Sequence, residues 1–226
     1  ARFSPALVRF LRAVLGELIE RVVIERPDVR GLLAPFADVV LADATVIKLH
    51  RLLAGKYPGT RTNSSPAAAK LHLVYSVLGR GVQRVKLTGE RTCEHRTLRI
   101  GPWVRGRLLL FDLGYFRYQL FDCIDRNGGY FLSRLPRRAN PRIVGVNRTW
   151  RGRQVPLIGA RLDEIAGRLR REELDVEVEV QFKRRVYAGR RRTARRRLRL
   201  VGVLEPESGM YRFYLTNIVP DTLDAQ

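Results

Sequence analysis

Two aspartates lie in apolar segments of this chain, where a carboxylate is costly unless it is paired or binds a metal. Asp43 interrupts "FADVVLADATVIKL", and Asp112 follows the run "RLLLF". Both segments have the β-branched or continuous apolar composition of buried strands. Neighbouring strands of an open α/β sheet can bring two such residues to one edge although they are far apart in sequence. Two carboxylates that lie close together in this way repel each other unless a divalent cation lies between them.

Carboxylate oxygens in a phosphate-seeking protein favour Mg²⁺ or Mn²⁺ over zinc. A pair of such ions about 3.5 to 4 Å apart activates a water or hydroxyl in phosphodiester chemistry and stabilises the leaving oxygen. The alternative is structural: Asp43 would pair with Lys48 or an arginine, and Asp112 would cap a helix that starts near Tyr115. A structural role is favoured for three further carboxylates in helical or capping positions, Asp122, Asp125 and Asp163.

The elements that position these residues indicate an α/β fold with a mixed sheet. Ser4 and Pro5 begin an amphipathic helix, and residues 36–49 then form a β-branched strand. After a loop at 54–69, we expect a hairpin from 70–79 and 82–89. The remaining elements of this half are a weakly helical segment at 90–101, a buried strand at 106–115, a helix at 116–129 and a strand at 130–136. Three meander strands followed by helix, strand, helix and strand predict mixed parallel and antiparallel pairing.

Beyond Pro136 the pattern becomes predominantly β. A short helix is expected at 162–172, and strands at 174–187, 195–205 and 209–219. The strand at 174–187 alternates valines with polar residues, as a half-exposed strand does. We interpret four parts: an N-terminal helical segment (1–35), the first part of the core (36–141), a β-rich basic insertion (142–213), and a return into the core (214–226).

The charge of the chain is strongly positive, with 43 Lys and Arg against 22 Asp and Glu and a formal net charge of +21. Most of the excess is arginine, whose planar fork suits phosphate. Nucleic acid is therefore the favoured partner over an acidic membrane surface. The cysteines and histidines show no zinc-binding or disulfide spacing. No apolar run reaches the roughly 18 residues of a membrane span, and no signal-peptide pattern opens the chain.

The basic residues are densest in "KRRVYAGRRRTARRRLR", residues 183–199. The alternative is a solvated hairpin in which arginines pair with Glu177 and Glu179 across the strands. Two glutamates cannot neutralise so many cations, so DNA-backbone binding is expected, with a strong dependence on salt. Trp150 has basic neighbours and could stack on a base, although packing is favoured for it and for Trp103. The candidate DNA-binding residues are Arg184, Arg185, Arg190, Arg191, Arg192, Arg195 and Arg196.

Several blocks in order resemble DDE transposases of the insertion-sequence-four type: "VLADATVIKLH", "VQRVKLTGERTCEH", "LLLFDLGYF", "LFDCIDRNGGYFLSRL" and "YRFYLTNIVPD". The resemblance implies a ribonuclease H-like catalytic domain interrupted by a β-rich insertion. Asp43 matches the first acidic residue of the triad, followed by Thr45. Asp112 matches the second, in a motif usually written aspartate, arginine, glycine, tyrosine. Leu113 replaces the arginine here, while the glycine and tyrosine are kept.

The same resemblance places the third acidic residue, a glutamate, on a helix after "YLTNIVPD". This helix is expected beyond Gln226, and Glu205 and Glu207 in the turn "EPESG" do not match it. We therefore expect these 226 residues to be a fragment that binds Mg²⁺ weakly and cuts no DNA. The resemblance implies that the chain is the catalytic region of a transposase, which cleaves DNA and transfers strands. It implies a homodimer that acts on transposon ends and target DNA. The expected location is the cytoplasm of a prokaryote, at the nucleoid. The alternatives are a nuclease of the same fold and a transposon-derived DNA-binding protein without chemistry.

Overall fold

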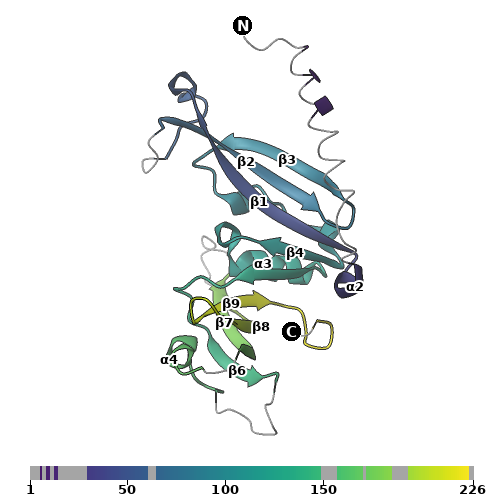
Figure 1. Ribbon diagram of the computed structural model, residues 1–226, viewed down its shortest axis with the longest axis vertical. Helices are drawn as coiled ribbons and strands as arrows, with labels where there is room; N and C mark the ends of the chain where they lie inside the picture. Colours follow the sequence, from purple (N-terminus) through teal and green to yellow (C-terminus); the bar gives the residue numbers. More distant parts are fainter. Residues whose placement is uncertain are drawn as a thin grey trace.

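The computed structural model describes residues 6, 9, 10, 13, 14, 30–60, 65–148, 157–169, 172–184 and 193–223. Nine strands within these residues form one sheet, in the order β3-β2-β1-β4-β5-β9-β8-β7-β6 (Figure 1). The mixed α/β class predicted from the sequence is confirmed.

The first half of the sheet contains the meander and the parallel strands that the sequence predicts. β1 pairs antiparallel with β2, which pairs antiparallel with β3, while β1 and β4 are parallel and so are β4 and β5. This order and these directions are those expected of a ribonuclease H-like core. The strands are β1 (Asp38–Leu49), β2 (Ala67–Ser76), β3 (Gly81–Gly89), β4 (Arg107–Phe111) and β5 (Tyr130–Arg134).

Helix α3 (Tyr118–Arg126) covers one face of this half. Its amphipathic spacing buries Phe121 and Ile124, and the Phe121 ring stacks on Phe131 of β5 with 4.2 Å between ring centroids. Phe121 also contacts Phe111 at the end of β4. The helix therefore packs on the face opposite to that of Leu108 and Leu110, because alternate strand residues point to opposite faces.

The second half continues the same sheet. β9 (Met210–Thr216) pairs antiparallel with β5, and β8 (Thr193–Glu205), β7 (Glu173–Lys183) and β6 (Arg142–Val146) follow in antiparallel order. Along β7 the apolar residues Val176, Val178, Val180 and Phe182 are buried, as their alternation predicts. The strands of the proposed insertion are thus joined to the core through β5 and β9.

Several predicted elements differ in extent. The expected helix at 90–101 is reduced to the 3₁₀ turn η2 (Glu94–Arg96), because the segment is polar and ends at Gly101; a second 3₁₀ turn, η3 (Pro102–Val104), follows it. β2 begins at Ala67, inside the expected loop, because Ala67 to Ala69 are buried beside β1. α4 (Leu162–Ala166) ends early, with Gly167 as its C-cap. The remaining short elements are α2 (Arg30–Leu33), η1 (Arg51–Leu53) and η4 (Leu113–Tyr115).

One strand and one α-helix were not predicted, β6 and α2. Of the amphipathic helix expected near the N-terminus, residues 6, 9, 10, 13 and 14 are described, and they are helical. The rest of that helix lies outside the described residues.

Candidate active site

Asp43 and Asp112 lie side by side on neighbouring parallel strands. The last paired residues of β1 and β4 are Ala42 and Phe111; Asp43 is the next residue of β1, and Asp112 is the first residue after β4. Neighbouring strands are about 4.8 Å apart, and each aspartate lies an even number of residues beyond the paired Val39 and Leu108. The alternation of side chains therefore directs both carboxylates to the same face of the sheet, Asp43 from within β1 and Asp112 from just after β4.

We call this side of the sheet the aspartate face. Both aspartates are exposed on it. In the same row as Asp43, β2 contributes Leu73 and β3 contributes Val85, which is 57% exposed. α3 packs on the other face, against Phe111 and Phe131, and Leu41 of β1, two residues before Asp43, is also exposed on the aspartate face.

The backbone around the two aspartates is held by short-range contacts. Asp43 Oδ1 accepts a hydrogen bond from the Ala44 amide at 2.7 Å. Asp112 is the N-cap residue of η4, but its side chain makes no capping hydrogen bond there. The structural alternative for Asp112, a carboxylate used to cap the next helix, is therefore wrong for this turn.

Tyr115 ties the turn after Asp112 to β1. Its side chain is buried, and its hydroxyl donates a hydrogen bond to the backbone carbonyl of Asp43 at 3.4 Å. Burial, followed by the negative charges of Glu94 and Asp43, raises the pKa of Tyr115 to about 12, against the effect of a hydrogen bond with Thr97. Tyr115 is therefore a neutral hydrogen-bond donor at physiological pH, and it positions the segment that carries Asp112.

Glu94 is a further carboxylate near this turn that sequence reasoning did not single out. It forms an ion pair with Lys70 Nζ at 3.1 Å, and both side chains are largely buried. A Cβ on Gly114 would overlap the Glu94 carboxylate, so the glycine of the motif allows Glu94 to approach this closely. Among the residues that the structure describes, no group of three His, Cys, Asp or Glu side chains is arranged to hold a metal ion.

The predicted DNA-binding arginines are only partly within the described residues. Arg184, Arg195 and Arg196 are described, and Arg195 is exposed opposite Gln181 on β7. Four others, Arg185, Arg190, Arg191 and Arg192, lie outside the described residues, as does Trp150. Trp103 is partly buried against the core and donates its indole N–H to the Arg99 carbonyl at 2.9 Å, which agrees with the packing role favoured for it.

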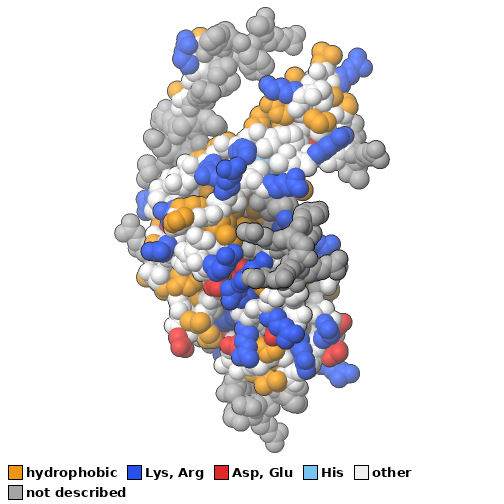
Figure 2. Space-filling model, turned by 180° about the vertical axis from the view of Figure 1, so that it is seen from behind, with side chains coloured by type: hydrophobic (Ala, Val, Ile, Leu, Met, Phe, Trp, Pro, Cys, Tyr) orange, Lys and Arg blue, Asp and Glu red, His pale blue; other side chains and the backbone are white. Residues whose placement is uncertain are grey.

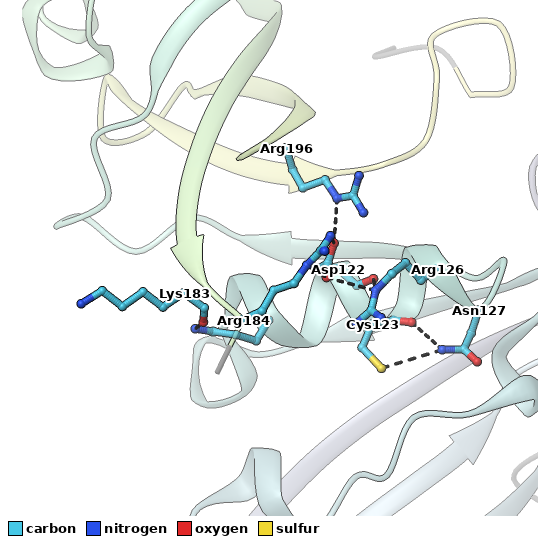
Figure 3. A network of polar contacts seen from close by, with 8 residues as sticks. Asp122, Cys123, Arg126, Asn127, Lys183, Arg184 and Arg196 are labelled. Atoms are coloured by element: carbon cyan, nitrogen blue, oxygen red, sulfur yellow. Dashed lines mark hydrogen bonds and ion pairs between the residues drawn. The ribbon is translucent and has the colours of Figure 1, made fainter. Parts of the chain in front are cut away.

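The alternative interpretation expected arginines of this segment to pair with Glu177 and Glu179. Arg184 and Arg196 do not. Both bind Asp122 of α3 (Figure 3). Asp122 was assigned a structural role from its helical position, and its burial agrees with that assignment. Sequence reasoning missed the cluster around it, although the i,i+4 spacing of Asp122 and Arg126 signals an ion pair on one helix face.

The other carboxylates have local partners. Asp125 accepts a hydrogen bond from Asn217 at 2.9 Å, and Asp163 lies in the first turn of α4. Glu205 pairs with Arg212 and accepts from Ser208 in an exposed turn. The hydrogen bond from Ser208, followed by the charge of Arg212, lowers the pKa of Glu205. Glu205 is remote in the sheet order from the strands of the two aspartates, since β8 and β1 are separated by β4, β5 and β9.

Basic side chains are spread widely over the surface. Figure 2 shows Lys and Arg from the end of the molecule formed by β1 to β3 down to the insertion, with acidic side chains mainly toward the insertion. Arg84 and Arg107 line a hollow of about 190 Å³ together with Trp103. Within the described residues, no helix is both long enough and apolar enough to cross a membrane.

The comparisons with known proteins agree on one family. The family model described as "Transposase DDE domain" matches residues 34–225. The transposase for insertion sequence element IS231F of Bacillus thuringiensis subsp. israelensis is 30% identical over 149 residues, which cover 62% of this chain and 30% of that protein. The transposase for IS231B of B. thuringiensis subsp. berliner is 28% identical over 144 residues, covering 59% of this chain and 29% of the relative.

The chain thus spans roughly a third of the length of these relatives. Among solved structures, a cryo-EM structure of the piggyBac transposase synaptic complex with hairpin DNA matches with a TM-score of 0.36 and 10% identity. That match covers 81% of this chain and 34% of the other.

Proposed function

Because this chain belongs to the DDE transposase family, we propose that it supplies the catalytic domain of a transposase, which cleaves DNA at the ends of a mobile element and joins them to a target. The observation that supports this proposal is the pairing of Ala42 with Phe111, after which Asp43 and Asp112 are the next residues of the two neighbouring segments. Both side chains are exposed there, so a DNA duplex can reach them.

Asp43 and Asp112 are the residues that would hold the divalent ions. Their oxygens are the ligands that Mg²⁺ and Mn²⁺ prefer, and their mutual repulsion is relieved by a cation between them. The bound ions would supply a nucleophile at neutral pH and stabilise the leaving oxygen of the phosphodiester. The chain's own contribution is to align the two carboxylates through the β1 and β4 register and the Tyr115 hydrogen bond. The third carboxylate is expected from the glutamate-bearing helix of the family.

The partner is double-stranded DNA, as transposon end and as target. The net charge of +21 and the exposed arginine Arg195 support backbone binding. Assembly as a homodimer on paired ends and action in the cytoplasm of a prokaryote, at the nucleoid, complete the proposal.

The test replaces each aspartate with its uncharged isostere, Asp43→Asn and Asp112→Asn, with Asp163→Asn as the matched control. Asp163 is likewise exposed, but it lies in α4 at the far end of the sheet order. Manganese binding is measured by electron paramagnetic resonance on the 226-residue chain. Cleavage and joining of a transposon-end duplex are measured on a protein that also contains the glutamate-bearing helix.

We expect both active-site variants to lose manganese binding, cleavage and joining while their melting temperatures stay close to that of the parent. The control variant should retain all three activities. Cleavage without joining of a pre-cut end would favour a nuclease. Full function in the Asp43→Asn variant would favour a DNA-binding protein without chemistry and would refute the proposal.

A further inference from the structure

Three guanidinium groups converge on one buried carboxylate where α3 meets the insertion (Figure 3). Asp122 accepts from Arg196 Nε at 2.7 Å, from Arg184 Nε at 3.1 Å and from Arg126 Nε at 3.1 Å. The arginines come from α3, from the residue after β7 and from β8, so the carboxylate connects three separate segments. We call Arg126, Arg184 and Arg196 the arginine cluster.

The arginine cluster has more positive charge than Asp122 can neutralise. Three guanidinium groups are always protonated, and the one carboxylate leaves two unit charges in excess. The Asp122 side chain is 1% exposed, whereas those of Arg126, Arg184 and Arg196 are 54%, 45% and 35% exposed. The anion is therefore enclosed, and the cations reach the surface.

Each guanidinium also keeps part of its hydrogen-bonding capacity. The bonds to the Asp122 carboxylate use the Nε of all three arginines and one further nitrogen of Arg184. Guanidinium carries several N–H donors in a planar fork, which matches the oxygens of a phosphate. Half-exposed groups with the same charge, held at a common centre, form a site for a second anion.

The ion pair of Asp175 and Arg199, in the same half of the sheet, is an example of a buried ion pair with a purely structural role. There one carboxylate meets one guanidinium, with side chains 4% and 6% exposed. A further Arg199 nitrogen donates to the Leu223 carbonyl at 2.6 Å, and Asn147 donates to Asp175 at 2.9 Å. Charges balance in that pair. In the arginine cluster they do not, and the excess faces solvent.

We propose that the arginine cluster binds one phosphate of the DNA backbone, and that Asp122 is a positioning residue that holds the three guanidinium groups together for it. The inference rests on the proposed function in that DNA is the partner. A phosphate contact of this kind orients a duplex without reading its sequence. It would fix the duplex at the junction between the core and the insertion, since the cluster spans both.

The test measures binding of a fluorescent duplex of arbitrary sequence to the 226-residue chain by anisotropy, in EDTA and over a series of salt concentrations. Without a divalent ion, the measurement does not depend on metal binding by Asp43 and Asp112, so failure of this inference and failure of the catalytic proposal can be told apart. The variants are Arg126→Gln, Arg184→Gln and the double variant. The matched control is Arg197→Gln, which removes the same charge from an exposed position next to Arg196 on β8.

We expect each single variant to weaken binding several-fold. The double variant should lower the slope of log affinity against log salt by about 0.9, the value for one phosphate contact. Arg197→Gln should change the slope by less than half as much. Equal losses in the control and in the cluster variants would mean that only the overall charge matters, and would overturn the proposal.

Asp122→Asn tests the positioning role, provided that its circular dichroism matches that of the parent chain. The substitution makes the protein more positive, so a purely electrostatic effect would strengthen DNA binding. If Asp122 holds the guanidinium groups in place, binding weakens despite the added charge. Stronger binding by a folded Asp122→Asn variant would refute the positioning role. Inorganic phosphate, titrated in competition at constant ionic strength, should displace the duplex from the parent chain more effectively than from the double variant.

Discussion

The carboxylate of Glu94 lies directly over Gly114, so closely that a Cβ on Gly114 would overlap Glu94 Oε2. Gly114 is the second residue after Asp112, in the turn that Tyr115 ties to β1. The space required for Glu94 therefore constrains the residue type in the motif that positions one of the two proposed metal ligands.

The substitution Gly114→Ala should displace Glu94 and break its ion pair with Lys70. Because that pair is only partly exposed, we expect a loss of about 1 kcal/mol in the free energy of unfolding, measured by urea denaturation. Manganese binding should weaken as well, because any overlap that Glu94 does not relieve by moving is taken up by the turn that carries Asp112.

Gly55→Ala is the control for this substitution, since nothing lies within 4 Å of a Cβ at that position. Glu94→Ala combined with Gly114→Ala should recover manganese binding by removing the overlap. A Gly114→Ala variant that binds manganese as well as the parent would show that the turn adapts freely.

Tyr115→Phe should reduce the loss of stability at alkaline pH. Burial and the nearby negative charges raise the pKa of Tyr115 from 10.0 to about 12, so the folded state retains this proton where the unfolded state has lost it. The stabilisation is complete below pH 10 and is lost as the pH rises toward 12. Between pH 9 and pH 11.5, the melting temperature of the phenylalanine variant should therefore fall less than that of the parent. Tyr75→Phe, for a partly exposed tyrosine on β2, is the control.

Asp122→Asn should change the acid sensitivity of the chain. Burial raises the pKa of Asp122, but hydrogen bonds from Arg196 and Arg184 and the charges of the arginine cluster outweigh it, so the pKa is lowered from 3.8. A lowered pKa stabilises the fold above the unfolded value, and this contribution is lost as the pH falls through the folded value. Between pH 5 and pH 2 the parent should lose more stability than Asp122→Asn, measured by urea denaturation. Asp163→Asn should follow the parent, and equal slopes in all three proteins would contradict the assignment.

Local patterns were sufficient to predict much of the fold. The alternation along β7 and the apolar run before Asp112 each depend on one strand and its burial, so periodicity identifies them. β6 escaped prediction because it is short and contains Gly145, beside a register shift between Ile143 and Gly145. The helix expected at 90–101 is absent because its helical spacing is weak and Gly101 and Pro102 end the segment, so that only 3₁₀ turns form there.

The parts of the site that could not be predicted depend on pairing between distant segments. The side-by-side position of Asp43 and Asp112 followed from the order of strands in the expected sheet. By contrast, Arg184 and Arg196 reach Asp122 only because the β7–β8 hairpin packs against α3, and no local pattern encodes that packing. Gly114 was recognised as part of a motif, but its contact with Glu94 required the structure.

Arg199→Met should be among the most destabilising single substitutions in the second half of the sheet. Arg199 and Asp175 form a buried pair at 2.5 Å, and removal of the cation leaves Asp175 charged and enclosed, which typically costs about 3 to 5 kcal/mol. The same substitution also removes the bond from Arg199 to the Leu223 carbonyl, so the segment after β9 should become easier to cleave by protease.

Arg197→Met, at an exposed position two residues earlier, should leave the urea midpoint nearly unchanged. The double variant Asp175→Asn with Arg199→Met should recover part of the loss, because no unpaired charge remains buried. If Arg199→Met and Arg197→Met had similar urea midpoints, the ion pair of Asp175 and Arg199 would contribute little to stability. The bond from Arg199 would then not explain how the segment after β9 is held against β8.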